Sequence, residues 1–407
     1  MEKQRKKPEL LAPVGDASKL NAALHFGADA VYFGGKNFGL RAFSKNFTNE
    51  EIEQAVRTTH AQGKKAYVTL NIFAKNADFA EAGDFYDFLA DVGTDAVIVS
   101  DPGMVQFLLR KGRKTDIHLS TQANTLNGYA VDFWRDVGVK RVVLARELSL
   151  DDIKEIKDHV GDSVELETFV HGAMCISYSG RCLLSSYLTP RDSNRGECVQ
   201  ACRWEYDFGE KSREKNLTLT EDDRGSYILN SKDMNTMPIL DRIIEAGVDA
   251  LKIEGRMKTE YYVGSVVRAY RKRIDDYFAG KPYDPRLNEE LYKVNHREYT
   301  TGFYLHEAEQ CYETSKPEND YRYCALVLGY DEEKGLLEVV QKNRFFDGDV
   351  LEVVSDRNVS ELKVDGVFDE NGERIADCKN VMQRLFLKTN VRLDPYDMLR
   401  KKTTERK

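Results

Sequence analysis

Hydrophobic residues over the first 280 positions alternate between short apolar runs and longer segments with helical spacing. The apolar runs predict eight strands, and amphipathic segments such as 50–60 and 237–246 lie between them. The expected strands are 9–13, 28–35, 65–73, 95–100, 116–122, 140–147, 164–172 and 249–256. A strand–helix unit repeated every roughly thirty residues is typical of parallel α/β architecture, and eight units favour a closed (β/α)8 barrel of the TIM type.

An open, doubly wound sheet is the alternative architecture. Such a sheet usually carries a glycine-rich phosphate-binding turn after its first strand. In this chain the corresponding turn is Pro13-Val14-Gly15-Asp16. The sequence therefore favours the barrel.

One connection in the expected barrel is much longer than the others. About 77 residues separate the seventh strand from the eighth, whereas the other spacings are near 25 to 35. The extra segment, about 173–235, contains a further possible strand at 226–230. Because insertions after a barrel strand lie at the carboxyl ends of the strands, where barrel enzymes hold their active sites, this insertion is the first candidate for chemistry.

The pattern changes after residue 280, which we take as the end of the barrel domain. Residues 281–320 are expected to connect two domains, and from 321 to 400 polar and apolar residues alternate with period two, with turns at Asp347-Gly348 and Asn371-Gly372. This pattern predicts a small C-terminal all-β domain, a barrel or a sandwich.

Alternation along the strands also predicts which side chains face the barrel interior. The helix-facing set includes Val68, Leu70, Leu251 and Ile253, which leaves a polar set facing inward. That inward set is Asn71, His118, Gln122, Glu167, His171, Lys252 and Glu254, and Arg256 continues it at the end of the last strand. Barrel interiors are usually apolar, so this set predicts a polar pocket, with a Lys252–Glu254 pair that only fills the barrel as the alternative.

The inward polar residues are assigned candidate roles. His118, Glu167, His171, Lys252 and Glu254 are the candidate catalytic residues. The candidate substrate-binding residues are Asn71, Gln122, Arg256 and, from the insertion, Arg203. Arg203 is one of four arginines near the cysteines described next, and these either bind an anion or RNA phosphate or lie on a solvated loop.

Four of the seven cysteines fall within 28 residues of the insertion, with the spacing Cys175-x6-Cys182-x15-Cys198-x3-Cys202. Thiolates favour soft metals such as zinc and iron–sulfur clusters. Structural zinc sites more often use Cys-x2-Cys pairs, so an iron–sulfur cluster is the first interpretation. Zinc, and unligated or catalytic thiols, are the alternatives. Cys324 lies in an apolar strand and is expected to be a core residue.

Composition and charge restrict the class of protein and the cellular compartment that we expect. The chain has 407 residues and a net charge of −8, which argues against a nucleic-acid binder with a basic whole surface but permits a local basic patch. It has no apolar run long enough for a membrane helix, and its basic N-terminus is not followed by a signal-peptide stretch. We expect a cytoplasmic protein that needs no membrane and, in a reducing compartment, no structural disulfides.

Several motifs together resemble the collagenase-like peptidase family U32. They are ETFVHGAMC at 167–175, GRCLLS at 180–185, GECVQACRW at 196–204, ELLAPVG at 9–15, STQ at 120–122 and KIEGR at 252–256. The resemblance covers nearly the whole chain, including the expected β-domain. The family name implies a peptidase, but the sequence has neither a His-Glu-x-x-His zinc motif nor a Gly-x-Ser-x-Gly nucleophile elbow.

The resemblance implies a different activity through the better-understood branches of the family, which hydroxylate without oxygen. The branch most similar to this chain forms 5-hydroxyuridine at the wobble position of tRNA, with prephenate implicated; other branches act on ribosomal RNA cytidine or on a ubiquinone precursor, the last with a 4Fe–4S cluster on four cysteines. The implied partners are tRNA, a small anionic co-substrate and a partner subunit of the same family. A peptidase and a non-catalytic binding module stapled by its metal remain the alternatives.

The resemblance leaves the fourth cluster ligand open. Some cluster-bearing relatives take one ligand from beyond the Asn-Ser-Lys-Asp segment, which here spans 230–233. No cysteine occurs between Arg203 and Gln310 in this chain. If four thiolates are needed, Cys202 is therefore expected to be the fourth.

Overall fold

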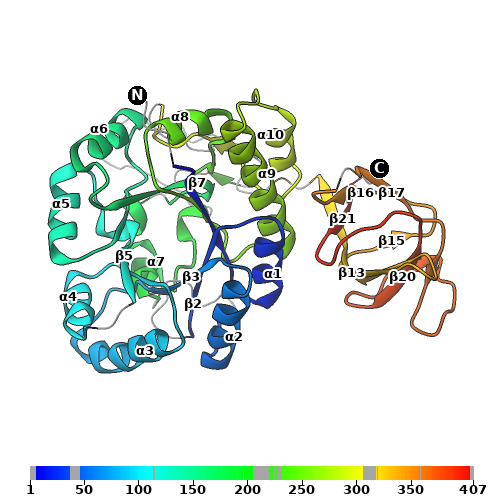
Figure 1. Ribbon diagram of the computed structural model, residues 1–407, viewed down its shortest axis with the longest axis horizontal. Helices are drawn as coiled ribbons and strands as arrows, with labels where there is room; N and C mark the ends of the chain where they lie inside the picture. The colour runs from blue at the N-terminus through cyan, green and yellow to red at the C-terminus, as the bar shows by residue number, and fades with distance from the viewer. Residues whose placement is uncertain are drawn as a thin grey trace.

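The computed structural model describes residues 6–36, 46–112, 115–175, 177–189, 191–195, 197–204, 221–222, 225–226, 231–305, 318, 320–357 and 359–403. Eight parallel strands form its central barrel (Figure 1). They are β1 (Glu9–Pro13), β2 (Ala30–Gly34), β3 (Lys65–Leu70), β4 (Ala96–Val99), β5 (Asp116–Leu119), β6 (Arg141–Val143), β7 (Glu165–Ala173) and β11 (Ala250–Ile253). Each strand pairs with the next along the chain, and β11 pairs with both β7 and β1, which closes the barrel. The predicted (β/α)8 fold is confirmed.

Helices follow the strands and cover the outside of the barrel (Figure 1). They are α1 (Ala17–His25), α2 (Asn49–His60), α3 (Phe79–Asp91), α4 (Pro102–Arg110), α5 (Gly128–Val137), α6 (Leu150–Val160), α8 (Leu240–Glu245) and α9 (Glu260–Phe278). Local sequence fixes where several begin: Thr48 and Glu51 form a reciprocal capping box at α2, and Ser149 and Asp152 form another at α6. None of the described helices is both long and apolar enough to cross a membrane.

The main hydrophobic core lies between the strands and the helices. It contains the side chains expected to face outward, among them Val68, Leu70, Leu251 and Ile253. A much smaller apolar cluster, which includes Leu11, Tyr32, Tyr67 and Ile98, lies apart from this core. The expected alternation of faces is therefore confirmed for β3 and β11. Most of the strands end earlier than predicted, whereas β1 ends at the predicted residue and β7 ends one residue later. Thr121–Ala123 form a short 3-10 helix after β5.

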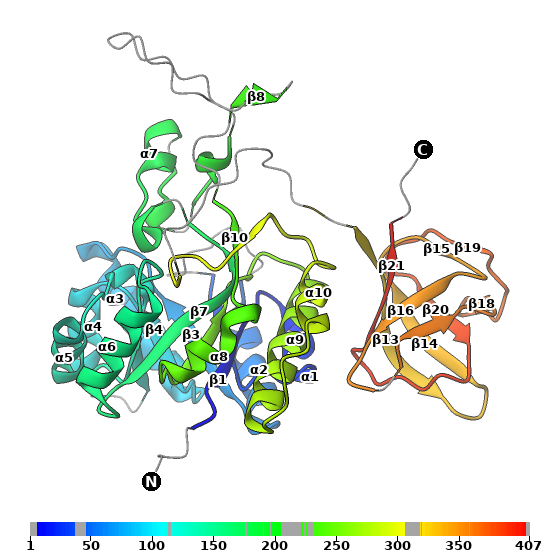
Figure 2. The ribbon, with the colours of Figure 1, turned by 90° about the horizontal axis from the view of Figure 1, so that it is seen from above.

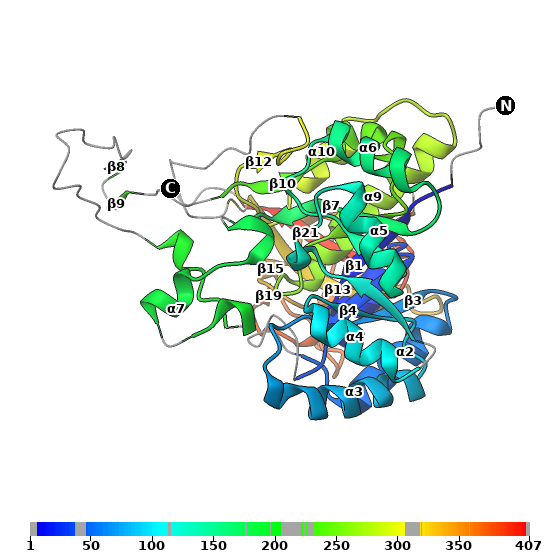
Figure 3. The same ribbon diagram turned by 90° about the vertical axis from the view of Figure 1, so that its left-hand side faces the viewer.

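The long connection between β7 and β11 leaves the barrel at one end. It contains α7 (Leu184–Leu188), β8 (Glu221–Asp222), β9 (Gly225–Ser226) and β10 (Asp233–Asn235), and α7 and β8 project beyond the barrel (Figures 2 and 3). Strand β10 returns antiparallel to β7 and also pairs with β12 (Tyr299–Thr300). The strand expected at 226–230 lies outside the described residues except for Ser226, which belongs to β9.

The C-terminal domain is an antiparallel all-β unit, as predicted, and lies beside α9 and α10 (Arg286–Leu291) (Figures 1 and 2). Its main sheet has seven strands in the order β17-β16-β21-β13-β14-β20-β18, and β15 pairs with β19. The strands are β13 (Tyr321–Asp331), β14 (Leu336–Gln341), β15 (Phe345–Phe346), β16 (Val350–Val354), β17 (Glu361–Lys363), β18 (Val367–Phe368), β19 (Asp377–Cys378), β20 (Arg384–Lys388) and β21 (Met398–Lys402). Cys324 and Cys378 are buried in the core of this domain, as expected for Cys324.

Buried contacts join this domain to the barrel. The rings of Tyr261 on α9 and Tyr323 on β13 stack with centroids 5.2 Å apart. The buried Arg400 guanidinium on β21 lies 2.8 Å from Glu290 of α10 and 2.9 Å from Glu352 of its own domain. Because an arginine with two carboxylate partners is fixed in direction as well as in charge, these contacts hold the two domains in one orientation.

Candidate functional site

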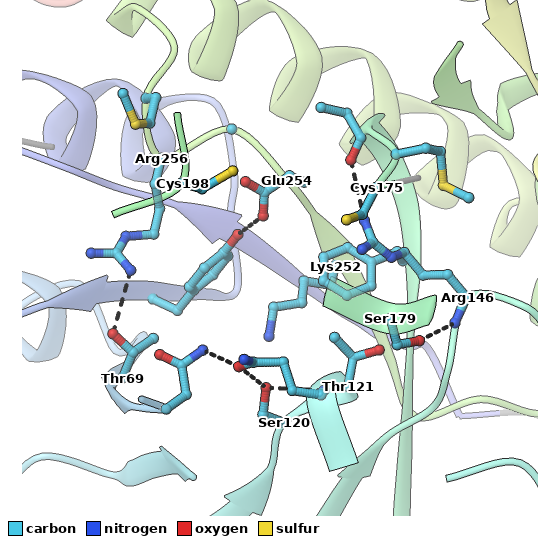
Figure 4. A pocket seen from close by; sticks show the side chains of 18 of the residues that line it. Thr69, Ser120, Thr121, Arg146, Cys175, Ser179, Cys198, Lys252, Glu254 and Arg256 are labelled. Carbon is cyan, nitrogen blue, oxygen red and sulfur yellow. Dashed lines mark hydrogen bonds between the residues drawn. The ribbon is translucent and has the colours of Figure 1, made fainter. Parts of the chain in front are cut away.

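A cavity of about 260 Å³ lies where the barrel strands end and the insertion begins (Figure 4). Its wall combines residues at or just after the ends of β3, β5, β7 and β11 with cysteines of the insertion. The carboxyl ends of the strands are where (β/α)8 enzymes bind their substrates. This cavity is therefore the candidate active site, and we call it the mouth pocket.

Below the mouth pocket, nearer the amino ends of the strands, charged side chains fill the barrel interior. Arg141 at the start of β6 is buried and lies 2.7 Å from Glu9, 2.7 Å from Glu165 and 3.1 Å from Glu167. Glu167 in turn pairs with Lys252 at 2.7 Å, and the Tyr67 hydroxyl donates to Glu9 at 2.9 Å. We call these six residues the interior ionic layer.

The interior ionic layer sets the charge state of its members. Burial alone would raise the pKa of Glu167, but Lys252 and Arg141 outweigh it and bring that pKa below its ordinary value. Burial would lower the pKa of Arg141, but Glu167 and Glu9 raise it above its ordinary value. Arg141 and Glu167 are therefore both charged near neutral pH and lie opposite charges of the other sign, whereas burial raises the pKa of Tyr67 and keeps its hydroxyl neutral.

Lys252 connects the interior ionic layer to the mouth pocket. Its ammonium group bonds Glu167 below, and the residue also lines the pocket. The ammonium lies 4.5 Å from the centroid of the Tyr32 ring and 5.5 Å from that of Phe169. Among the predicted catalytic residues, Lys252 and Glu254 line the mouth pocket, whereas Glu167 contacts it only through Lys252.

The two candidate histidines lie elsewhere. His118 is buried in edge-to-face contact with Tyr67, at a ring-centroid distance of 4.7 Å, and does not line the mouth pocket. Burial, followed by the nearby charges of Arg141 and Lys252, lowers the pKa of His118 well below its ordinary value. The imidazole is therefore neutral at physiological pH and distant from any substrate in the pocket.

His171 was expected to face the interior with Glu167, and the structure places it on the opposite side. Lys252 pairs with Phe169 and Ile253 pairs with His171, so Val170 is an extra residue that forms a β-bulge. The Val170 carbonyl accepts hydrogen bonds from Tyr270 and from Thr236. The bulge reverses the alternation, and the His171 ring packs against Tyr262, Tyr270 and Tyr299, where burial lowers its pKa to about 3.

Arg256 lies at the mouth pocket, at the turn after β11 (Figure 4). Its guanidinium is buried and donates to Asn46 at 2.8 Å and to Thr69 at 3.4 Å. A Cβ atom at Gly34 would overlap this guanidinium, so a larger residue there would force the Arg256 side chain to move. Glu254 accepts from the Tyr32 hydroxyl at 3.3 Å, and Lys252 bonds Glu167. The Lys252–Glu254 pair, which was the alternative interpretation of the sequence, is therefore not the contact that the structure shows for these two residues.

Two amide side chains, those of Asn71 and Gln122, also line the mouth pocket. The Asn71 side-chain nitrogen donates to Gln122 Oε1 at 3.0 Å, and Ser120 Oγ donates to the same oxygen at 3.2 Å (Figure 4). Gln122 is buried, with 3% of its surface exposed. Both amides were predicted from strand alternation, although Gln122 belongs to the short helix after β5.

Two cationic residues of the mouth pocket were missed from the sequence. Arg146 follows β6, donates to the Ala173 carbonyl at 3.2 Å and lies over the Phe169 ring. Lys258 follows Arg256 along the same loop. Both come just after the carboxyl end of a barrel strand, and this position is the signal that would have identified them. With Lys252 and Arg256 they give the described pocket wall four cations against one carboxylate, Glu254.

The four clustered cysteines lie around the same opening. Cys175, Cys198 and Cys202 line the mouth pocket, and Cys182 lies in the adjoining loop. The sulfur of Cys182 accepts from the Leu184 amide at 3.3 Å, and that of Cys198 from the Gln200 amide at 3.4 Å, as thiolate ligands commonly do. Within the described residues, however, no three Cys, His, Asp or Glu side chains are close enough together to hold a metal ion. The ligand types suit a cluster, but their spacing in this structure does not.

Three contacts fix the insertion to the barrel. Arg195 pairs with Asp78 after β3 at 2.8 Å, and this hydrogen-bonded pair lowers the Asp78 pKa to about 2. The buried Ser179 amide donates to Glu147 at 2.6 Å, and Arg181 donates to the Gln122 carbonyl at 2.8 Å. These arginines thus hold the insertion in place. The side chain of Arg203 lies outside the described part of the structure.

A polar, cation-rich pocket at the carboxyl ends of a parallel barrel is the arrangement that barrel enzymes use. The chain belongs to peptidase family U32: the model "Peptidase family U32" matches residues 15–314, and "Peptidase family U32 C-terminal domain" matches residues 319–400. The family predicted from the motifs is confirmed.

Relatives in this family carry two kinds of name. The chain is 39% identical to "tRNA hydroxylation protein P1" of Bacillus subtilis, over 97% of this chain and 95% of that protein. It is 37% identical to "tRNA hydroxylation protein P" of Escherichia coli, over 90% of each chain. It is also 35% identical to "Collagenase" of Porphyromonas gingivalis, over 73% of each chain. The match to the collagenase therefore leaves about a quarter of the chain uncovered.

Proposed function

We propose that this protein hydroxylates tRNA, forming 5-hydroxyuridine from a wobble uridine without molecular oxygen. The observation that carries the proposal is the end-to-end similarity to proteins named for tRNA hydroxylation, across both domains. Because the similarity extends through the mouth pocket, the insertion and the β-domain, it supports a shared activity rather than a shared fold alone.

The chemistry of the mouth pocket supports this proposal. A uridine must leave the base stack to reach a pocket inside a protein, and a flipped base needs an apolar surface for its face and polar groups for its edge. Phe169 and Ile98 supply the apolar surface, and Asn71 and Gln122 supply the polar groups. Four cations at the described wall suit RNA phosphate or a small anionic co-substrate such as prephenate.

The predicted residues take different roles in this proposal. Lys252, Glu254 and Arg256 contact the substrates, since all three line the mouth pocket. Glu167 acts through Lys252 by holding its ammonium group in place. His118 and His171 are neutral and packed away from the pocket, so neither is assigned a catalytic role.

We further propose that Cys175, Cys182, Cys198 and Cys202 bind an iron–sulfur cluster, of the 4Fe–4S type. The proposal rests on four thiols in one insertion, three of them at the pocket wall, and binding requires the insertion to bring the sulfurs closer together. A bound cluster would supply electrons at the pocket or hold the insertion together. Anaerobically purified protein is expected to be brown with near-stoichiometric sulfide, and stoichiometric zinc without sulfide would instead support the zinc site.

The fourth ligand has its own test. Cys202→Ala is expected to lose the cluster as fully as Cys175→Ala, because no other cysteine of the sequence lies between Arg203 and Gln310. Iron and sulfide are measured in each purified variant, with Cys324→Ala in the β-domain core as the control. A normal cluster in Cys202→Ala would mean that the fourth ligand is not this thiol.

A peptidase is the second candidate, because one relative is named a collagenase. Among the described residues that line the mouth pocket there is no histidine to activate a cysteine or serine nucleophile. The experiment that separates the two is nucleoside mass spectrometry of tRNA from a deletion strain with and without the restored gene. Loss of 5-hydroxyuridine that the gene restores supports hydroxylation. Unchanged tRNA, together with peptide hydrolysis by the purified protein, would support the peptidase.

A further inference from the structure

The Gln122 amide group is fixed in one direction inside the mouth pocket. Its Oε1 accepts two hydrogen bonds, from Asn71 Nδ2 at 3.0 Å and from Ser120 Oγ at 3.2 Å. An amide oxygen has two acceptor lone pairs, and both are used. The Nε2 group therefore points away from Asn71 Nδ2, because rotation of the amide would place two donor groups against each other there.

The same Nε2 group is an unmet donor. It is buried and has no hydrogen-bond partner among the residues that the structure describes. Gln122 is 97% buried and lines the mouth pocket, so solvent exposure does not compensate for the missing bond. Buried donors in native proteins are nearly always paired, and an exception in a pocket marks where a ligand acceptor belongs.

The residues around Gln122 Nε2 indicate which kind of ligand carries the acceptor. Ile98 and Phe169 give the pocket an apolar surface, whereas Asn71 and Ser120 lie beside Gln122 on the polar side. A flat ring with a carbonyl group on its edge matches this division, because its face packs on apolar groups while its edge is hydrogen-bonded. A pyrimidine base with an exocyclic carbonyl is such a ring.

We propose that Gln122 Nε2 donates a hydrogen bond to O4 of the flipped uracil and thereby selects uracil over cytosine. This inference rests on the proposed function, in which C5 of the uridine reacts. O4 is bonded to the neighbouring carbon, so an anchor at O4 also fixes the position of C5. Cytosine presents an amino group at the same place, and two donors would then face each other without an acceptor.

The decisive variant is Gln122→Glu. It keeps the oxygen that accepts from Asn71 and Ser120, replaces the unmet donor by a second acceptor of similar size and adds a negative charge. Gln54→Glu is the matched control, because Gln54 lies exposed on α2. We expect Gln122→Glu to lower tRNA 5-hydroxyuridine by about tenfold or more in the complemented deletion strain, as for loss of a base-edge contact. Because the variant places a carboxylate at a buried position, its melting temperature is expected to fall, so 5-hydroxyuridine is compared per amount of folded protein.

Two outcomes of this experiment overturn the inference. One is normal 5-hydroxyuridine with Gln122→Glu. The other is a loss of 5-hydroxyuridine that scales with a lowered melting temperature, which would make Gln122 a structural residue. Failure of the wild-type gene to restore 5-hydroxyuridine would instead count against the proposed function itself.

A binding measurement tests the base assignment without any hydroxylation. Uridine 5′-monophosphate should raise the melting temperature of the purified holoprotein more than cytidine 5′-monophosphate does, and the difference should vanish in Gln122→Glu. Equal shifts with the two nucleotides, or none with either, would overturn the assignment of Nε2 to uracil O4. A preference for uridine that Gln122→Glu retains would overturn it as well.

Discussion

The interior ionic layer and the mouth pocket are adjacent polar regions of one barrel, but their polar groups are satisfied differently. In the layer, Arg141 faces three carboxylates and Glu167 faces two cations. In the mouth pocket, cations outnumber the carboxylate at the described wall, and the buried Nε2 of Gln122 has no partner within the described structure. The pairing of polar groups, rather than their presence, therefore separates a region that supports the fold from one prepared for a ligand.

The largest effect on stability is expected from Arg141→Met. Removing the guanidinium leaves Glu9, Glu165 and Glu167 with too few cations, and breaking a buried ion pair in this way costs about 3–5 kcal/mol. The free energy of unfolding in urea measures the loss. Arg286→Met is the control, because the Arg286 side chain is 84% exposed and pairs only at the surface. A loss as small as that of the control would mean that the layer does not support the fold.

A smaller effect is expected from acid. The folded-state pKa of Glu167 lies below its ordinary value of 4.5, so its ion pairs stabilise the protein above that pH and are lost as the pH falls through the folded-state pKa. The difference in unfolding free energy between wild type and Glu167→Gln should therefore be largest above the ordinary pKa and shrink as the pH falls through the lower folded-state pKa. A difference that stays constant with pH would show that Glu167 is not charged in the folded protein.

The smallest effect on stability, with the largest on function, is expected from Arg256→Gln. The variant loses the hydrogen bonds to the neutral groups of Asn46 and Thr69, and these two bonds together contribute about 1–2 kcal/mol to the free energy of unfolding. Hydroxylation should be abolished, because the guanidinium is the pocket group best suited to grip a carboxylate or phosphate. Thermal unfolding and tRNA 5-hydroxyuridine are measured together. Normal values for both would remove Arg256 from the active site, and a proportional fall in both would make it structural.

The barrel fold and several residues of the mouth pocket could be predicted from the sequence. The spacing of apolar runs predicted the closed barrel, and period-two alternation placed Lys252, Glu254 and Asn71 at the end of the strands where the pocket lies. These predictions hold because they depend only on local periodicity and on the common direction of parallel strands.

Other features depend on contacts that local periodicity does not record. The bulge at Val170 turns His171 away from the interior, and its carbonyl is held by Thr236 and Tyr270, at positions 66 and 100 residues away. Arg141 is a charged residue at the start of β6, and the sequence pattern does not distinguish it from a residue at a strand end that faces solvent. Its partner Glu9 lies 132 positions earlier in the chain. The face of a strand on which a side chain lies follows from local periodicity. The side chain with which it pairs can be identified only in the folded structure.

The position of Arg141 has a consequence for the order of folding. Glu9 belongs to the first strand of the barrel and Glu167 to the seventh, so the guanidinium cannot meet both until the two ends of the sheet approach each other. In a half-formed, open sheet, the charged side chains of the interior ionic layer would be partly shielded from water and would lack partners of opposite charge. Ring closure and charge matching are therefore expected to occur in the same step, late on the folding pathway, with partially closed intermediates disfavoured by their own electrostatics.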